Sequence, residues 1–374
     1  MNLDRKKIIS TAKKIVVKVG SSILCNDQGK FSSVCVEKVG KELLTLIKAK
    51  KECVLVSSGS VACGMDMLHI KRRPKELPML QACAAIGQGK LMKIYESFFV
   101  KRKHHTAQIL LTQDILNNRS RYLNTRNTLN TLLKLGAISI VNENDTVATE
   151  EIKFGDNDRL SVLVALIIGA DLIINLSNVR GVLDANKEVI SDVQSLTELD
   201  KLDKHLFDEK TATTVGGMKS KLDAAHTAMS SGVSMLIADG KDYKVLEKIL
   251  KGEEVGTLFY PSQKKTSFTR SWLIHLSSPK GTIHLDKGAF EAIKNKGKSL
   301  LSSGIKSIDG KFKEGDVVRL VYSTKEEFSR GLTNYSSEDL NKIKGKQSKD
   351  IKAILGNQFY DEVIHRDNLV LLKS

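Results

Sequence analysis

The segment KIVVKVGSS, Lys14 to Ser22, indicates the fold most clearly, because an apolar run passes directly into a turn of small residues. Its first six residues show little polar alternation. This pattern predicts a strand buried on both faces, as in a parallel sheet covered by helices. Lys18 lies near the end of the strand and Gly20 begins the turn. In a doubly wound sheet, ligands bind where strands pass into loops at their carboxyl ends, so this junction is a candidate site.

Further short apolar runs alternate with longer amphipathic segments up to about Leu258. This alternation predicts an α/β domain with a largely parallel sheet covered by helices. The expected strands are residues 14–19, 53–58, 108–112, 137–142, 171–176 and 233–238, and the expected helices are residues 33–50, 80–103, 119–135, 158–169 and 219–231.

The residue pattern changes between Pro261 and Pro279. Beyond Pro279 the sequence predicts short strands separated by glycine turns. We expect a catalytic domain at residues 1–262, a linker at 263–278 and a small β-rich domain at 279–374, which is within the usual size range of domains. From Lys264 onward the chain has 21 Lys and Arg residues against 13 Asp and Glu residues. The C-terminal part is therefore basic.

The composition, 41% hydrophobic and 27% charged residues, is that of an ordinary globular protein. The longest apolar run, residues 161–170, is too short to span a bilayer, and the N-terminus has no secretory signal. We expect no membrane segment and a cytoplasmic location. The five cysteines show no metal-ligand spacing. The net charge of +16 is compatible with a nucleic-acid partner, an anionic substrate or simply a lysine-rich surface, and the last is the default interpretation.

The segment VNENDTVATEEIKFGDND, residues 141–158, contains six carboxylates and three asparagines but Lys153 as its only cation. A carboxylate with a structural role normally pairs with an arginine or lysine, or caps a helix. Because Lys153 is the only local candidate, the sequence favours a ligand-binding role for Asp145. The middle of the segment is expected to be a hairpin or lid, with Glu150 and Glu151 on a solvated loop face.

Glycine turns recur where the expected strands end, at SSGS (57–60) and LSNVRG (176–181), and TTVGGMKSK (213–221) leads into an expected helix. Backbone N–H groups at such turns bind anions, and phosphate is the obvious candidate. Met65 stands where a P-loop needs lysine, and GxGxxG is absent from the first junction, which disfavours P-loop NTPases and Rossmann dehydrogenases. Lys219 and Lys221, expected in the first turn of a helix, oppose its dipole and indicate an anionic partner. The alternative, a surface lysine on a solvated turn, is reasonable for Lys219 and less convincing for Lys221.

Together, KVGSS, SSGS, NENDTVATEEIKFGDND and VGGMKSK resemble the amino acid kinase superfamily, and specifically its members that phosphorylate glutamate. The tail, with GIKSIDGKFKEGDVVR and HRDNLV, resembles a PUA domain. The resemblance implies a three-layer αβα sandwich with a mostly parallel sheet, and transfer of phosphate from ATP to the γ-carboxylate of L-glutamate, the first step of proline biosynthesis. It implies Mg²⁺ bound through the ATP phosphates, with no metal ligand assigned among the side chains.

The resemblance also implies roles for individual residues. Lys18 and Lys221 would stabilise the transferring phosphoryl group while Asp158 holds both lysines. Gly20 and Gly59 would donate backbone N–H groups to phosphate oxygens. The implied glutamate site consists of Ser58, Asn142, Asp145 and Asn157. The implied ATP site consists of Lys18, Ser177, Asn178, Val215, Gly216, Gly217, Met218, Lys219, Ser220 and Lys221.

Three features depart from the family pattern on the nucleotide side. Ser177 and Asn178 replace a Thr-Asp pair, the loop GVLDANKEV lacks the usual proline, and Val215 replaces a smaller residue. Adenine contacts in this superfamily are largely made by the backbone, which tolerates such changes.

Two alternatives remain, one being another kinase of the same superfamily and the other a protein of a different class. A kinase for aspartate, N-acetylglutamate or UMP would share Lys18 and the lysine loop but has no need for NEND beside GDND. An RNA-binding role is suggested by the basic PUA-like tail. Its aromatic residues number too few to distinguish base stacking from core packing, and core packing is favoured for most of them. Assembly as a dimer or tetramer and feedback inhibition by proline are expectations from the family.

Overall fold

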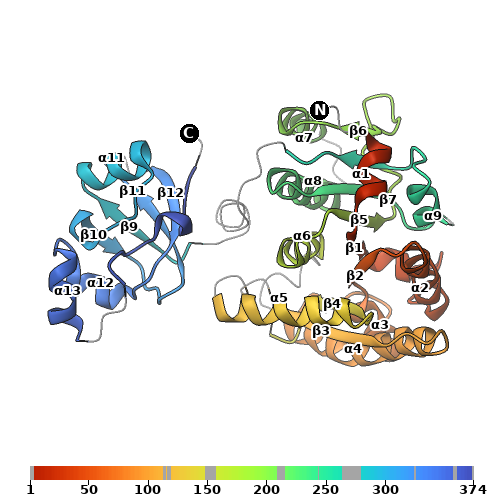
Figure 1. Cartoon of the computed structure of the whole chain (residues 1–374). Helices are drawn as coiled ribbons and strands as arrows, with labels where there is room; N and C mark the ends of the chain where they lie inside the picture. Colours follow the sequence, from red (N-terminus) through yellow and green to blue (C-terminus); the bar gives the residue numbers. More distant parts are fainter. Residues whose placement is uncertain are drawn as a thin grey trace. The chain divides into compact units, whose positions relative to one another are not determined.

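The computed structural model describes residues 4–112, 115, 119–147, 157–208, 215–242, 244–262, 279–323, 326–356 and 360–372 (Figure 1). The chain divides into two compact units. The expected linker, 263–278, lies outside the described residues, so the domain boundaries stay predictions. None of the described helices combines the length and apolar character needed to cross a membrane.

The first unit is built on an eight-stranded sheet of order β3-β4-β2-β1-β5-β7-β8-β6. Among the described strands every pairing is parallel except that of β7 with β8, so the expected mostly parallel sheet is confirmed. The six expected strands match observed strands to within two residues. The strands are β1 (Lys14–Val19), β2 (Glu52–Ser57), β3 (Thr106–Leu111), β4 (Ile138–Glu143), β5 (Leu172–Ser177), β6 (Asp192–Val193), β7 (Ser234–Asp239) and β8 (Thr257–Phe259).

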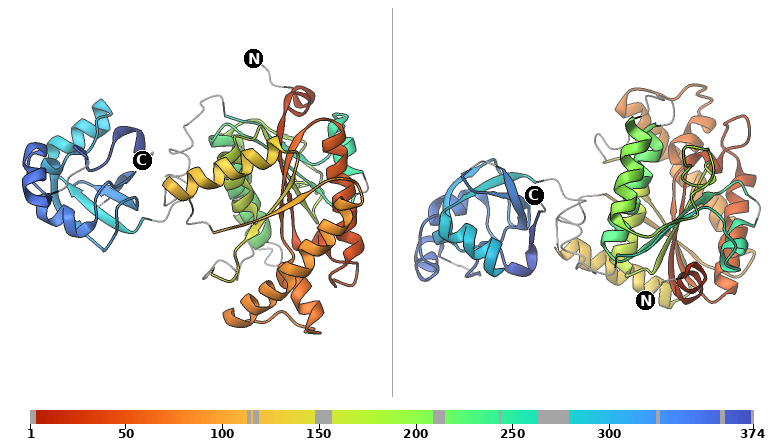
Figure 2. Two further views of the ribbon diagram at one scale, coloured as in Figure 1. Left: turned by 60° about the horizontal axis from the view of Figure 1, so that its bottom comes forward. Right: turned by 90° about the horizontal axis from the view of Figure 1, so that it is seen from above.

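Helices cover both faces of this sheet, which gives the three layers (Figure 2). The five expected helices correspond to α2, α4, α5, α6 and α8, whereas α1, α3, α7 and α9 were not anticipated. The observed helices are α1 (Arg5–Thr11), α2 (Ser33–Lys48), α3 (Ser60–Met67), α4 (Leu77–Val100), α5 (Arg119–Lys134), α6 (Asn157–Ile168), α7 (Leu196–Asp208), α8 (Val215–Ser230) and α9 (Val245–Leu250).

Strand alternation decides which side chains of β1 reach the site. Ile15, Val17 and Val19 belong to the hydrophobic core that includes residues of α2, α4 and α9. Because successive side chains point to opposite faces, Lys18 points to the other face, where α6 packs against β1. The register pairs Lys18 with Asn175 of β5. A lysine and an amide therefore lie side by side on the face covered by α6.

The order of the strands also locates the site. From β1 the chain continues to β2 on one side, and later returns to β5 on the other side of β1. Such a reversal of strand order opens a crevice at the carboxyl ends of the strands, where ligands bind in open α/β sheets. The turns after β1, β2, β4 and β5 meet at this edge.

Two glycines allow α3 and α4 to pack closely beside that edge. A Cβ atom at Gly64 would lie 1.9 Å from the carbonyl oxygen of Cys83, and one at Gly87 would lie 1.9 Å from that of Ser60. Neither position accepts a side chain without moving a backbone. The second glycine of GSVACG therefore serves helix packing, which is consistent with the missing P-loop lysine.

The second unit contains a five-stranded sheet of order β10-β9-β11-β12-β13 and its own core of buried residues. Phe312 and Tyr335 belong to this core, whereas Tyr360 is exposed. The unit is more helical than the expected β-rich domain. Its elements are β9 (Gly281–Leu285), α11 (Lys287–Lys296), η4 (Ser302–Gly304), β10 (Ile305–Asp309), β11 (Val317–Val321), β12 (Glu327–Leu332), α12 (Ser337–Ile343), α13 (Ser348–Leu355), η5 (Arg366–Asn368) and β13 (Leu369–Leu371).

Candidate active site

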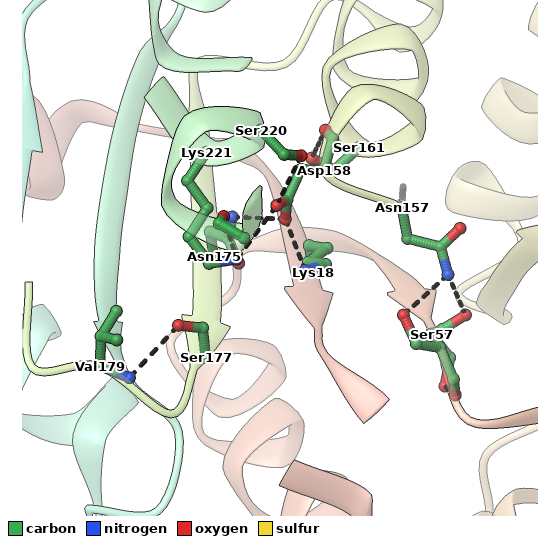
Figure 3. Close-up of polar contacts among 12 residues, drawn as sticks. Lys18, Ser57, Asn157, Asp158, Ser161, Asn175, Ser177, Val179, Ser220 and Lys221 are labelled. Atoms are coloured by element: carbon green, nitrogen blue, oxygen red, sulfur yellow. Dashed lines mark hydrogen bonds and ion pairs between the residues drawn. The ribbon is translucent and has the colours of Figure 1, made fainter. Parts of the chain in front are cut away.

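A buried carboxylate, Asp158, joins three elements at the carboxyl edge of the sheet (Figure 3). Its Oδ1 atom lies 2.5 Å from Lys18 Nζ of β1, and its Oδ2 atom lies 3.1 Å from Lys221 Nζ of α8. Asn175 Nδ2 donates to Oδ1 at 2.8 Å, and Ser220 Oγ donates to Oδ2 at 3.1 Å. We call these five residues the Asp158 cluster. The two lysines that the resemblance placed around the phosphoryl group thus share one counter-ion.

The cluster is ionised and tightly bonded. Burial alone would raise the pKa of Asp158, but the charges of Lys18 and Lys221, with hydrogen bonds from Lys18 and Asn175, lower it to about 2. Asp158 also lies in the first turn of α6, where the helix dipole favours a negative charge. Two ammonium groups around one carboxylate leave a net charge of +1 at this point. That charge suits a phosphate.

Helix α8 begins at Val215 and not at Lys219 as expected. Gly216 and Gly217 therefore form its first turn, while Lys219 and Lys221 lie in the second turn, where the dipole acts weakly. The expectation that the dipole opposes these lysines is wrong, because the two glycines belong to the helix and not to the loop before it. No Cβ atom at Gly217 would meet another atom within 4 Å.

Lys219 and Lys221 point to different partners. Lys219 Nζ lies 2.5 Å from Asp203 Oδ2 of α7 and 3.2 Å from Asp223 Oδ1 of its own helix. Its side chain is 42% exposed, whereas that of Lys221 is 12% exposed. Lys221 also donates to the carbonyl oxygen of Gly217 at 3.1 Å. The structure brings Lys221 into the Asp158 cluster and leaves Lys219 in an ion pair at the surface.

The glycine turns after β1 and β2 differ. The N–H group of Gly20 donates to the carbonyl oxygen of Leu176 at 3.1 Å, so in this conformation it is engaged with β5 and not available to a phosphate oxygen. The turn continues into the 3₁₀ helix η1 (Ser21–Leu24), whose first N–H groups have no acceptor inside the helix. Gly59 has φ +100° and caps α3, and a Cβ atom there would lie 2.8 Å from Leu24 Cδ1. Gly59 therefore needs to be glycine.

The amides of the predicted glutamate site meet beside the Asp158 cluster. Asn157 Nδ2 donates to Ser58 Oγ at 2.8 Å and to the carbonyl oxygen of Ser57 at 3.1 Å (Figure 3). It also donates to Asn142 Oδ1 at 3.2 Å. Three of the four residues predicted to bind glutamate are therefore in one hydrogen-bonded group.

Asp145, the fourth predicted residue, is half-buried and accepts a hydrogen bond from Ser60 Oγ at 2.9 Å. Burial raises its pKa, while the Ser60 hydrogen bond and the charge of Arg73 oppose the rise. The argument that Lys153 is the only available cation was therefore wrong, because Arg73 acts on Asp145 from the segment between α3 and α4. Lys153, Glu150 and Glu151 lie outside the described residues, as does the expected hairpin or lid.

The nucleotide-side residues lie at the end of β5 and in α8. Ser177 is buried, and its Oγ atom accepts from the N–H group of Val179 at 3.3 Å. Asn178 is exposed, and Met218 is half-buried in α8. The Ser177 side chain thus supports the turn of its own loop. The described residues bring Ser177 and the Asp158 cluster to the same edge (Figure 3).

Several residues of the site were missed in the sequence. Asn175 had a signal, an amide inside the apolar run DLIINL, and such a residue in a buried strand needs a partner. Gln88 of α4 accepts from Asn142 Nδ2 at 2.8 Å, and Ser60 and Arg73 contribute to Asp145. These last three come from α3, α4 and their connection. Ser60 belongs to the SSGS turn, which the sequence does indicate, but nothing in the sequence pattern indicates that Gln88 and Arg73 reach the site.

Comparison with known proteins shows the family of the chain. The model of the amino acid kinase family matches residues 13–239, and that of the PUA domain matches residues 281–355. Glutamate 5-kinase from Caldanaerobacter subterraneus subsp. tengcongensis is 44% identical over 364 residues, covering 96% of this chain and 98% of that protein. The chain belongs to the glutamate 5-kinase family. It is a kinase with an additional C-terminal PUA domain.

Other members of the glutamate 5-kinase family are equally similar. The protein from Dictyoglomus turgidum is 45% identical over 363 residues, covering 96% of this chain and 97% of that protein. The protein from Carboxydothermus hydrogenoformans is 43% identical over 372 residues, covering 98% and 100%. The similarity therefore extends through both units and includes the PUA domain.

Proposed function

We propose that the Asp158 cluster is the phosphoryl-transfer centre of this kinase and that the neighbouring amides and Asp145 hold L-glutamate. As a member of the glutamate 5-kinase family, the chain uses ATP to phosphorylate the γ-carboxylate of L-glutamate, in proline biosynthesis. The observation that carries the residue assignment is the sharing of one buried carboxylate by Lys18 and Lys221. This geometry fixes two cations at one point.

The reaction needs no general base. The γ-carboxylate of glutamate, with a pKa of about 4.3, is already ionised at neutral pH. Catalysis then depends on aligning the two substrates and stabilising the charge that spreads over the transferring group. Lys18 and Lys221 supply this stabilisation, and because Asp158 holds both side chains in place, little reorganisation accompanies the reaction.

Mg²⁺ enters the site with ATP in this proposal, bound to the phosphates. Among the described residues no three His, Cys, Asp or Glu side chains converge so that they could hold a metal ion. When bound, the ion supplies charge neutralisation on the phosphates. Ser177 and Asn178, the start of α8 from Val215 to Lys221, and the turns at Gly20 and Gly59 form the ATP side.

Asp145 receives the substrate ammonium group in this proposal, and Ser58, Asn142 and Asn157 orient the rest of the amino acid. The raised pKa of Asp145 supports this role, since burial with only partial compensation leaves the carboxylate in need of a cation. A rival substrate without an ammonium group, such as N-acetylglutamate or UMP, has no cation to place beside the buried carboxylate of Asp145.

The proposal extends to the remaining properties of the chain. We assign it to the cytoplasm, with boundaries at 262 and 279, a homo-oligomeric state and proline inhibition at the glutamate site. RNA binding is not part of the proposal, because Phe312 and Tyr335, two aromatic residues of the PUA domain, belong to the core of the second unit.

An assay of ADP release tests the proposed function. We expect release to require both L-glutamate and Mg²⁺, and the acyl phosphate to be trapped by hydroxylamine as the hydroxamate. Turnover with aspartate or N-acetylglutamate, but not with L-glutamate, would contradict the substrate assignment. Repeating the assay with proline tests the feedback proposal, and a light-scattering mass measurement tests the oligomeric state.

A further inference from the structure

Three amide side chains form a chain of hydrogen bonds that leads from the Asp158 cluster to α4. Asn157 donates to Asn142, and Asn142 Nδ2 donates to Gln88 Oε1 at 2.8 Å. We call Asn157, Asn142 and Gln88 the amide chain. Its direction is fixed by the backbone N–H group of Glu143, which donates to Asn142 Oδ1 at 2.9 Å. Because an N–H group only donates, this Asn142 atom is the oxygen, and Gln88 therefore presents its oxygen to Asn142.

The two ends of the amide chain have opposite character. Asn157 Oδ1 is an acceptor and Gln88 Nε2 is a donor, and neither buried atom has a hydrogen-bond partner in the part of the chain that the structure describes. Asn157 is only 6% exposed. A buried polar atom without a partner costs about 1–3 kcal/mol, so a ligand that supplies both partners is favoured. An α-amino acid does so, because its ammonium group donates and its α-carboxylate accepts.

The packing of α4 brings Gln88 to this position. Gly87 lies where a Cβ atom would meet the carbonyl oxygen of Ser60 at 1.9 Å, so α4 lies directly against the start of α3. Two turns further along α4, the buried Tyr95 places its hydroxyl group 3.2 Å from Ser57 Oγ. One side of α4 therefore reaches the ends of both β2 and β4.

We propose that Gln88 is a substrate-binding residue whose Nε2 group donates to the α-carboxylate of L-glutamate, while Asn157 Oδ1 accepts from the ammonium group together with Asp145. The inference rests on the proposed function. The strand order supports binding of the α-carboxylate, and not of the reacting γ-carboxylate, at Gln88. Lys18 is on β1, Asn142 is on β4, and β2 lies between them. The amide chain thus extends across two strand spacings, on the order of 10 Å, away from the phosphoryl-transfer centre.

The variants Gln88→Leu and Gln88→Glu test this role. Leucine, of similar volume, removes both the Nε2 donor and the Oε1 acceptor for Asn142, whereas glutamate keeps an acceptor for Asn142 but turns a carboxylate oxygen toward the substrate. We expect the KM for L-glutamate to rise about 10- to 100-fold in both variants while the KM for ATP changes less than about twofold. Ser97→Glu, at an exposed position of the same helix, is the control that adds the same charge.

A second ligand separates substrate binding from a structural role. 4-Aminobutyrate keeps the ammonium group and the acceptor carboxylate of glutamate but lacks the α-carboxylate. Its inhibition constant against L-glutamate should change less than about twofold in Gln88→Leu, because the lost hydrogen bond has no counterpart in this ligand.

Two outcomes would overturn the inference: an unchanged KM for L-glutamate in both variants, or an equal loss of affinity for L-glutamate and 4-aminobutyrate. The second outcome would show that Gln88 only supports the shape of the site. A wild-type chain without glutamate-dependent ADP release is a different result, because it would refute the proposed function itself.

Discussion

The Asp158 cluster and the amide chain lie at the same edge of the sheet but differ in whether their polar atoms have hydrogen-bond partners within the protein. Both carboxylate oxygens of Asp158 are bonded to side chains of the protein, and its pKa is lowered to about 2. In the amide chain a donor and an acceptor stay without partners among the described residues, and the pKa of nearby Asp145 is raised.

Polar groups therefore have two different roles at this edge, one in stabilising charge and one in binding the substrate. The Asp158 cluster stabilises the folded state by itself and is preorganised for the charge of the phosphoryl group. The amide chain and Asp145, which we call the recognition region, stabilise the fold less. Their buried polar groups find all their partners only when a ligand is bound. We therefore expect substitutions in the cluster to change kcat and substitutions in the recognition region to change the KM for L-glutamate.

The largest expected effect is that of Lys221→Ala. The variant removes one of two cations that stabilise the transferring group, and kcat should fall about 10²- to 10³-fold, as for loss of one preorganised donor. The KM for L-glutamate should change little, because Lys221 is not among the amides that hold the amino acid. Steady-state kinetics with both substrates varied give the two constants. A normal kcat with a raised KM for L-glutamate would refute the division between the two regions.

Asp158→Asn and Asp145→Asn should have different effects on the free energy of unfolding. The folded pKa of Asp158 is below its unfolded value, so its contribution to stability is fully present above about pH 4 and is lost as the pH falls toward 2. Asp158→Asn should lower the free energy of unfolding at pH 7 by about 3–5 kcal/mol, since it leaves two lysines without their counter-ion. This deficit should shrink below about pH 4, where Asp158 of the unfolded chain begins to take up a proton while folded Asp158 is still ionised.

Asp145→Asn should leave the free energy of unfolding at pH 7 unchanged or slightly higher. Its folded pKa is raised, so the ionised carboxylate costs stability at neutral pH, and protonation at lower pH removes that cost. The same variant should raise the KM for L-glutamate about 10-fold or more. Urea unfolding at pH 7 and pH 3.5, combined with kinetics, tests both statements. A large loss of stability in Asp145→Asn would contradict the contrast between the regions.

The sequence predicted the parallel sheet and the position of Lys18, because strands buried on both faces are continuous apolar runs and a lysine at the end of one is conspicuous. It also predicted the two lysines around Asp158, through the resemblance. The observed start of α8 lies before Gly216 and Gly217, although a pair of glycines is typical of a loop. A first helical turn tolerates glycine when packing of later turns stabilises the helix.

Gln88 and Arg73 were not predictable in the same way. Each reaches the site only because α4 and the segment before it pack on α3, and this packing depends on Gly64 and Gly87. A glycine that permits contact between two helices looks in the sequence like any other glycine within a helix. Positions set by such long-range contacts carry no local periodicity, so the recognition region was less complete in the sequence than the phosphoryl-transfer centre.

The smallest expected effect is that of Lys219→Ala, two residues before Lys221. Lys219 pairs with Asp203 and Asp223 at the surface, and its side chain is 42% exposed. Exposed ion pairs contribute about 0–1 kcal/mol, so the free energy of unfolding should fall by no more than about 1 kcal/mol, and kcat should stay within about twofold of the wild type. Urea unfolding and steady-state kinetics measure both. A loss of kcat comparable to that of Lys221→Ala would show that Lys219 leaves its ion pair to reach the phosphates, and the distinction between the two lysines would then be wrong.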